Sequence, residues 1–180
     1  LSIMGPNSRK LLSKLTDEDL SNDHFPFGTG KEIEIGYSKA LALRVTYVGE
    51  LGWELYITSE FAQDLYDRLL EAGKEMGLKH AGMHALNSLR LEKAYRHWGH
   101  DITDEDTPLE AGLSFAVAWD KSGGFLGREA LIRKKENGLL KKRMVQFALE
   151  NPEPLLYHNE PIWCGNTIVG DTTSGMYGHT

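Results

Sequence analysis

Polar and apolar side chains alternate along three short stretches in the first third of the chain. These stretches are residues 31–36, 41–47 and 53–57. Alternation with a period of two is typical of strands that bury one face and expose the other. We therefore expect a mainly antiparallel sheet. Its last two strands should meet at a corner where Gly49 and Gly52 permit backbone angles or close approaches that larger residues resist.

Apolar residues recur at helical spacing in four other stretches. The helices that this spacing predicts cover residues 7–15, 59–73, 80–98 and 127–137, where either Gly73 or Gly77 can end the second helix. In the second helix, Phe61, Leu65 and Leu69 lie four residues apart and predict one buried stripe. The third helix has a broad apolar face, so we expect it to pack beneath the sheet.

The C-terminal part of the chain predicts further short strands. They cover residues 115–119, 143–149 and 167–173, while the stretch 151–161 contains three prolines and predicts a loop. No partner strand is expected for residues 167–173. This succession of strands and helices predicts an α+β fold with a mixed, mainly antiparallel sheet and packed helices.

Composition and charge exclude several classes of protein. The chain has 180 residues, of which 41% are hydrophobic and 26% are charged, as is typical of a globular protein. A net charge of −6 argues against nucleic-acid binding as the main function, because affinity for nucleic acid comes largely from Lys and Arg. No apolar run approaches the length that spans a bilayer. Cys164 is the only cysteine, which excludes a disulfide framework, and we expect its thiol to be buried and unreactive.

Tyr47, Glu50 and Glu54 are grouped around the corner with the two glycines. An ionised carboxylate only accepts hydrogen bonds, and an aromatic ring offers a flat face. The group therefore suits a flat heterocycle that carries N–H donors. The alternative is a surface hairpin with solvated glutamates, which is the commonest setting for carboxylates.

The corner also resembles a known family. Residues 47–54, Tyr-Val-Gly-Glu-Leu-Gly-Trp-Glu, are similar to the Tyr-Thr-Gly-Glu-x-Gly-aromatic-Glu signature of the glycine cleavage T-protein (aminomethyltransferase) family. Further motifs similar to those of the family occur in the same order, at residues 1–15, 88–93, 99–102 with 107–113, 125–131 and 169–175. Within the family, Val48, Trp53 and residues 91–98 look more like the folate domain of dimethylglycine and sarcosine dehydrogenases than like the free T-protein.

The resemblance implies a fold and an activity. It implies a folate-binding domain over residues 1–140 and an incomplete C-terminal β-barrel over residues 141–180. It also implies a flavin-dependent demethylating dehydrogenase acting on dimethylglycine, sarcosine or a related N-methyl amine, whose tetrahydrofolate takes up the one-carbon unit. The alternatives are a free aminomethyltransferase of glycine cleavage and a non-catalytic folate-binding or regulatory homologue. Folate and a one-carbon-bearing amine are the expected partners, without nucleic acid or membrane.

The same resemblance assigns residues to the site. Tyr47 and Glu54 match the positions that hold the pterin of tetrahydrofolate, and Glu50 is expected to stabilise the turn. Arg90 is expected either to face the folate, whose carboxylate suits a guanidinium, or to tie helix to sheet. The acidic catalytic residue of the family is expected upstream of Leu1, so no catalytic residue is assigned. FAD is expected to bind outside these residues, which contain no nucleotide-binding glycine fingerprint.

Two polar clusters are expected to be structural. His97, His100, Asp101 and Asp104 are close in sequence, but no second group supplies a convincing fourth ligand, so we expect no metal. The basic run at residues 133–143 is expected to be a solvated helix end, since cations there complement the helix dipole.

We expect the chain to be a fragment truncated at both ends. It begins with Leu1, and its first fifteen residues resemble the inside of a domain, while the strand at residues 167–173 leads into a turn without a further strand. A single cysteine is compatible with a reducing compartment. Bacterial cytoplasm and mitochondrial matrix both remain open as locations.

Overall fold

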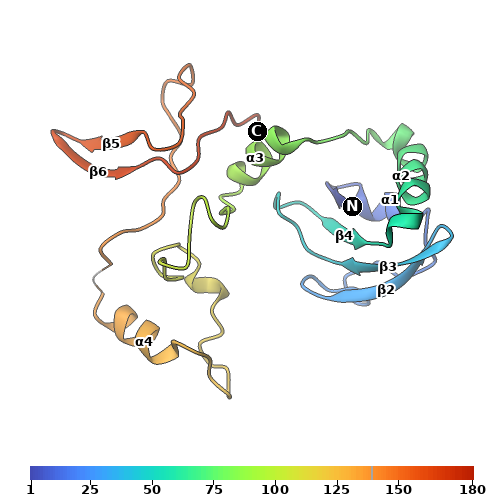
Figure 1. Ribbon diagram of the computed structural model, residues 1–180, viewed down its shortest axis with the longest axis horizontal. Coiled ribbons are helices and arrows are strands. Elements are labelled where there is room, and N and C mark those ends of the chain that lie inside the picture. Colours follow the sequence, from blue (N-terminus) through green and yellow to red (C-terminus); the bar gives the residue numbers. More distant parts are fainter. Residues whose placement is uncertain (139) are drawn as a thin grey trace. The chain divides into compact units, whose positions relative to one another are not determined.

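The computed structural model describes residues 1–138 and 140–180 (Figure 1). Its contacts divide the chain into two compact units. The N-terminal unit comprises residues 1–95 with Thr180, and the C-terminal unit comprises residues 96–179. The domain division expected at residues 140 and 141 stays a prediction.

A four-stranded antiparallel sheet forms the centre of the N-terminal unit (Figure 1). Its strands are β1 (Ser2–Met4), β2 (Gly30–Ile35), β3 (Ser38–Leu43) and β4 (Gly52–Tyr56), in the order β1-β4-β3-β2. β4 is an inner strand, and in its register Glu54 lies opposite Ser2 of β1 and Leu43 of β3. The period-two pattern thus yields the expected antiparallel sheet.

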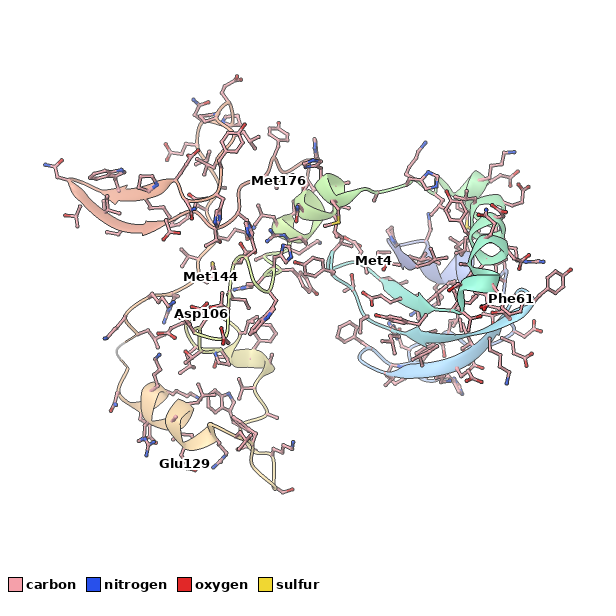
Figure 2. The ribbon with its side chains drawn as sticks, viewed as in Figure 1. Met4, Phe61, Asp106, Glu129, Met144 and Met176 are labelled. Atoms are coloured by element: carbon pink, nitrogen blue, oxygen red, sulfur yellow. The ribbon has the colours of Figure 1, made fainter. Side chains whose placement is uncertain are left out.

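One face of this sheet forms the core, which α1 (Ser8–Leu12) and α2 (Ser59–Gly73) cover (Figure 1). Trp53 is fully buried there, and its ring meets Phe25 edge-on with the ring centres 6.1 Å apart. Leu65 and Leu69 of α2 are buried as expected. The prediction was wrong for Phe61, which lies in the first turn of α2 and is 41% exposed (labelled in Figure 2).

The strand expected over residues 41–47 is too long, because β3 ends at Leu43. The amide of Val45 bonds to the carbonyl of Leu43 at 3.0 Å, which closes a three-residue turn and ends the ladder. Residues 44–51 therefore form a loop between β3 and β4, and Tyr47 lies in this loop instead of on a strand.

The long helix expected over residues 80–98 was also wrong. α2 is followed by a short 3-10 helix, η1 (Lys74–Met76), and α3 spans only Met83–Glu92. α3 buries Arg90, while Met83 is 64% exposed, so it lacks the expected buried apolar face. It ends because Ala94 adopts the left-handed conformation, with a φ of 56°.

The C-terminal unit contains fewer regular elements. They are η2 (Ser114–Ala116), α4 (Arg128–Glu136), β5 (Pro161–Cys164) and β6 (Thr167–Asp171). Polar contacts connect its loops: Asp101 accepts hydrogen bonds from the hydroxyls of Thr173 and Ser174, at 2.7 and 2.5 Å. Lys142 pairs with Asp106 at 2.6 Å, and Asp106 is labelled in Figure 2.

Three expectations for the C-terminal unit were wrong. Residues 115–119 are not a strand, because η2 and local turns occupy this region, and the Trp119 indole donates to the carbonyl of Ser114 at 3.1 Å. Residues 143–149 form no ladder. β6 does have a partner, since β5 pairs with it to form a hairpin closed at Gly165, which has a φ of 59°.

The α+β fold class is confirmed, and the open two-stranded β5–β6 sheet fits an incomplete barrel. The expected helix near residues 127–137 is also confirmed as α4. Cys164 was expected to be buried but is exposed at the end of β5. None of the helices in the described part of the chain is long and apolar enough to cross a bilayer.

Candidate functional site

The corner between β3 and β4 requires its two glycines for different reasons. Gly49 has a φ of 70°, and a Cβ there would lie 2.6 Å from Cγ of Lys93. At Gly52, a Cβ would lie 2.9 Å from the Ile3 carbonyl oxygen and 2.8 Å from Cγ of Met4. The first glycine permits the turn and the second permits the close approach of β1.

Glu54 lies on the face of β4 opposite the core. Because side chains alternate along a strand, it shares this face with Gly52 and Tyr56, while Trp53 and Leu55 point into the core. The Tyr56 hydroxyl donates to Oε2 of Glu54 at 2.6 Å. This hydrogen bond to the carboxylate raises the pKa of Tyr56, so the hydroxyl keeps its proton.

Tyr47 and Arg90 are brought together by Tyr95. The rings of Tyr47 and Tyr95 meet edge-on, with centres 6.2 Å apart. Nη1 of Arg90 donates to the Tyr95 carbonyl at 3.0 Å, and the Arg90 side chain is only 2% exposed. The two predicted residues, 43 positions apart in the chain, therefore contact the same tyrosine.

Glu50 forms an ion pair across the corner. Its Oε1 lies 3.4 Å from Nζ of Lys93, which follows α3 directly. Both side chains are nearly half exposed, so the pair contributes little free energy. The expected role of Glu50 in the turn stays a prediction.

A hollow of about 340 Å³ lies beside the corner. Its lining combines backbone and small side chains of the loop with two aromatic rings and two charged groups: Phe27, Arg44, Val45, Thr46, Gly49, Glu50, Leu51, Gly52 and Tyr95. Tyr47, Glu54 and Arg90 do not line it in this conformation. Glu54 is the next residue after Gly52 on the same face of β4, about 7 Å along the strand.

Two lining residues were missed by the sequence reasoning. Tyr95 belongs to the motif at residues 91–98, but its place beside Tyr47 depends on where α3 ends. Phe27 is 66% exposed and lines the hollow, whereas Phe25, two residues earlier in the chain, is fully buried in the core. No sequence signal distinguishes these two phenylalanines.

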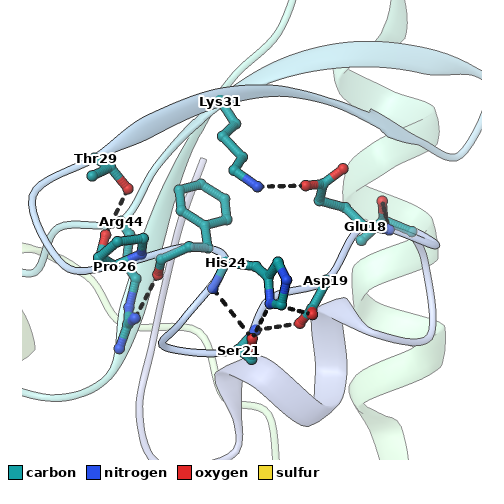
Figure 3. Close-up of polar contacts among 10 residues, drawn as sticks. Glu18, Asp19, Ser21, His24, Pro26, Thr29, Lys31 and Arg44 are labelled. Atoms are coloured by element: carbon teal, nitrogen blue, oxygen red, sulfur yellow. Dashed lines mark hydrogen bonds and ion pairs between the residues drawn. The ribbon is translucent and has the colours of Figure 1, made fainter.

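Arg44 gives the hollow a positive edge. Its Nη1 donates to the Phe25 carbonyl at 2.5 Å, as Figure 3 shows, and its Nη2 donates to Oδ1 of Asn22 at 2.8 Å. Arg9 donates to the same Asn22 oxygen at 2.7 Å. Burial lowers the pKa of Arg44, and the charge of Arg9 adds to the effect. Both guanidinium groups lie over the Trp53 ring, which offers them its electron-rich face.

The histidine cluster lies in the C-terminal unit and is a separate feature. The rings of His100 and His158 stack with centres 4.5 Å apart, and the His97 ring lies 5.6 Å from that of His100. Asp101 accepts a hydrogen bond from the His97 amide at 2.8 Å. Within the described residues, no group of three or more His, Cys, Asp or Glu side chains is arranged to hold a metal ion.

Comparison with known proteins defines the class. The family models described as the GCVT N-terminal domain and the glycine cleavage T-protein C-terminal barrel domain match residues 1–121 and 142–180. The chain therefore belongs to the glycine cleavage T-protein family, as its corner signature predicts.

Individual relatives include an oxidase and a dehydrogenase. The chain is 48% identical to the 4-methylaminobutanoate oxidase (formaldehyde-forming) of Paenarthrobacter nicotinovorans, over all of this chain and 22% of that protein. It is 43% identical to the mitochondrial dimethylglycine dehydrogenase of Homo sapiens, over all of this chain and 21% of that protein. It thus spans about a fifth of the length of these relatives.

A solved structure resembles the fold. It is the glycine cleavage system aminomethyltransferase T from Bartonella henselae, with a TM-score of 0.59 and 28% sequence identity. The match covers 76% of this chain and 36% of that chain.

Proposed function

We propose that this chain is the tetrahydrofolate-binding region of a flavin-dependent demethylating dehydrogenase that acts on an N-methyl amine such as dimethylglycine or sarcosine. Tyr47, Glu54 and Arg90 are the proposed site residues, and FAD is proposed to bind outside residues 1–180. The observation that carries the proposal is the Glu54 carboxylate on the same strand face as a hollow with aromatic walls.

The chemistry of the corner fits a reduced pterin. The pterin edge presents N–H donors, and a carboxylate is the strongest side-chain acceptor for them. With one oxygen bonded to the Tyr56 hydroxyl, the other oxygen of Glu54 is oriented by the same contact. A volume of about 340 Å³ lies at the lower end of the range for ligand pockets. A flat ring in the hollow would reach Glu54 with one edge.

The proposed division of tasks rests on these contacts. Tetrahydrofolate, when bound, supplies the amine nitrogens that take up the one-carbon unit. Glu54 holds and orients the pterin edge, and the rings of Tyr47 and Tyr95 exclude water from one side. Arg90 acts from behind these rings, through its hydrogen bond to Tyr95.

Replacing Glu54 by Gln tests the proposal in the protein encoded by the complete reading frame. The amide keeps the shape of the side chain, but it removes the charge and places a donor against pterin donors. Tetrahydrofolate affinity should fall roughly ten- to a hundredfold, corresponding to the loss of about 1.5–3 kcal/mol from a charge-assisted hydrogen bond. Calorimetric titration under reducing conditions measures it.

Two other carboxylates serve as controls. Glu50→Gln removes a charge that already pairs with Lys93, and it should weaken binding less than Glu54→Gln does. Glu32→Gln removes an exposed β2 carboxylate that pairs with Lys39 at 3.2 Å and should leave binding unchanged. Equal folate affinity in the wild type and Glu54→Gln would remove Glu54 from the site.

A further inference from the structure

The turn after α3 fixes one residue, Tyr95, against the hollow. The Tyr95 amide bonds to the Arg90 carbonyl at 3.0 Å, and the Ala94 amide bonds to the Leu91 carbonyl at 2.9 Å. These two bonds form a Schellman motif, in which the residue at the left-handed position is usually glycine. Here that residue is Ala94, whose φ of 56° is disfavoured for a side chain with a Cβ.

The side chain of Arg90 reinforces the same turn. Its Nη1 donates to the Tyr95 carbonyl, so Arg90 contacts both the amide and the carbonyl of Tyr95. The Tyr95 ring is in turn oriented by its edge-on contact with Tyr47. Strained backbone persists where its surroundings determine it, and such positions cluster at ligand sites. Backbone and ring of Tyr95 are therefore both set in place before a ligand arrives.

We propose that Tyr95 is a ligand-contacting residue of this site, which offers its ring face to the flat heterocycle of the ligand. Tyr95 and Phe27 are the two aromatic side chains that line the hollow. Phe27 is 66% exposed, whereas Tyr95 is partly buried and held by the contacts with Arg90 and Tyr47. A preorganised ring loses little entropy on binding, so it contributes more affinity than a mobile one. The inference rests on the proposed folate function.

The test compares three tyrosine variants in the protein encoded by the complete reading frame. Tyr95→Leu removes the ring and should weaken tetrahydrofolate binding roughly tenfold, as expected for the loss of an aromatic stacking partner. Tyr95→Phe keeps the ring and should bind within about threefold of the wild type, because only a neutral hydroxyl is lost. Tyr66→Leu is the control. Tyr66 belongs to α2 in the same unit, its ring stacks on that of His80, and it does not line the hollow.

Binding of tetrahydropterin, which lacks the tail of folate, shows whether Tyr95 contacts the ring system or the tail of the ligand. If Tyr95 contacts the ring system, Tyr95→Leu should weaken the binding of tetrahydropterin and of tetrahydrofolate by the same factor. An undiminished affinity of folded Tyr95→Leu for both ligands would overturn the inference. If that result accompanies weak binding by Glu54→Gln, the proposed function survives without Tyr95. If the wild type binds neither ligand, both proposals fall.

A tryptophan at this position covers the case in which Tyr95→Leu does not fold. Tyr95→Trp keeps an aromatic ring beside Tyr47 and adds a fluorescent reporter at the hollow. Saturating tetrahydropterin should change the fluorescence emission of Tyr95→Trp more than it changes the emission of the wild type. Identical emission changes in this variant and the wild type would contradict a contact at Tyr95.

Discussion

The two units of this chain are stabilised by different forces. The N-terminal unit has a continuous apolar core that contains Trp53, Phe25 and the buried leucines of α1 and α2. In the C-terminal unit, Ile102 and Ala111 are the buried apolar residues among those the structure describes, beside the buried carboxylates Asp101 and Glu110. The difference indicates that the unit with the corner depends on packing, whereas the other depends on charge pairs and hydrogen bonds.

Truncating the central aromatic residue should show the largest effect. Trp53→Ala removes a fully buried ring that contacts Phe25, and we expect the free energy of unfolding to fall by about 3–5 kcal/mol. Trp163→Ala in β5 is the control in the other unit, because Trp163 is 58% exposed and its loss should cost less than about 0.5 kcal/mol. Urea denaturation monitored by circular dichroism measures both. Similar losses of unfolding free energy at the two positions would contradict the difference in packing between the two units.

The next largest effect concerns Glu110 in the C-terminal unit. Its Oε1 pairs with Nζ of Lys134 at 2.7 Å, and its Oε2 accepts hydrogen bonds from the hydroxyl and amide of Thr107. The bond from Lys134 makes the largest contribution to lowering the pKa of Glu110 to about 2, and Thr107 adds to it. The ordinary value is 4.5. Because the folded pKa is the lower one, the stabilisation is complete above pH 4.5 and is lost as the pH falls towards 2.

Glu110→Gln should therefore destabilise the protein in a pH-dependent manner. At neutral pH we expect a cost of about 2–3 kcal/mol, which should shrink as the pH falls through the range between the two pKa values. Urea denaturation at a series of pH values measures the difference from the wild type. Glu32→Gln, at an exposed pair in the other unit, should cost less than about 1 kcal/mol at every pH. A pH-independent cost of Glu110→Gln would contradict the charge-based account.

The smallest expected effect is a gain of stability at the left-handed position of the N-terminal unit, and none at that of the C-terminal unit. Ala94→Gly relieves a backbone conformation that costs an L-residue about 1–2 kcal/mol, so a net gain of roughly 0.5–1 kcal/mol is expected. Asn159 in the other unit has a φ of 67°, but asparagine tolerates this conformation. Asn159→Gly should therefore gain nothing. Thermal unfolding measures the stability of both variants. A loss of stability in Ala94→Gly would contradict the claim that the backbone at Ala94 is strained.

The sequence predicted best where one face of an element is buried. Residues 31–36 and 53–57 alternate because β2 and β4 bury one face against α1 and α2. In the C-terminal unit, β6 was predicted but its partner β5 was missed, because the strands of this hairpin bury little, although Gly165 marks its turn. The end of α3 was missed for another reason: an alanine at a Schellman position carries none of the signal that glycine would.

The site shows the same limit. Gly49 and Gly52 fix the corner through local backbone geometry, which a motif records directly. Tyr95 and Phe27 line the hollow only because segments distant in sequence come together in the folded unit. Periodicity contains no information about such contacts, so the aromatic wall of the hollow emerged from the structure.

Hydrogen–deuterium exchange on adding tetrahydrofolate tests most directly where the ligand binds. In the protein encoded by the complete reading frame, we expect slower amide exchange over residues 44–54 and 90–95. We expect no change in α2, which covers the opposite face of the sheet from Glu54. Unchanged exchange at both corner segments under saturating tetrahydrofolate would contradict the assignment of the site to this corner.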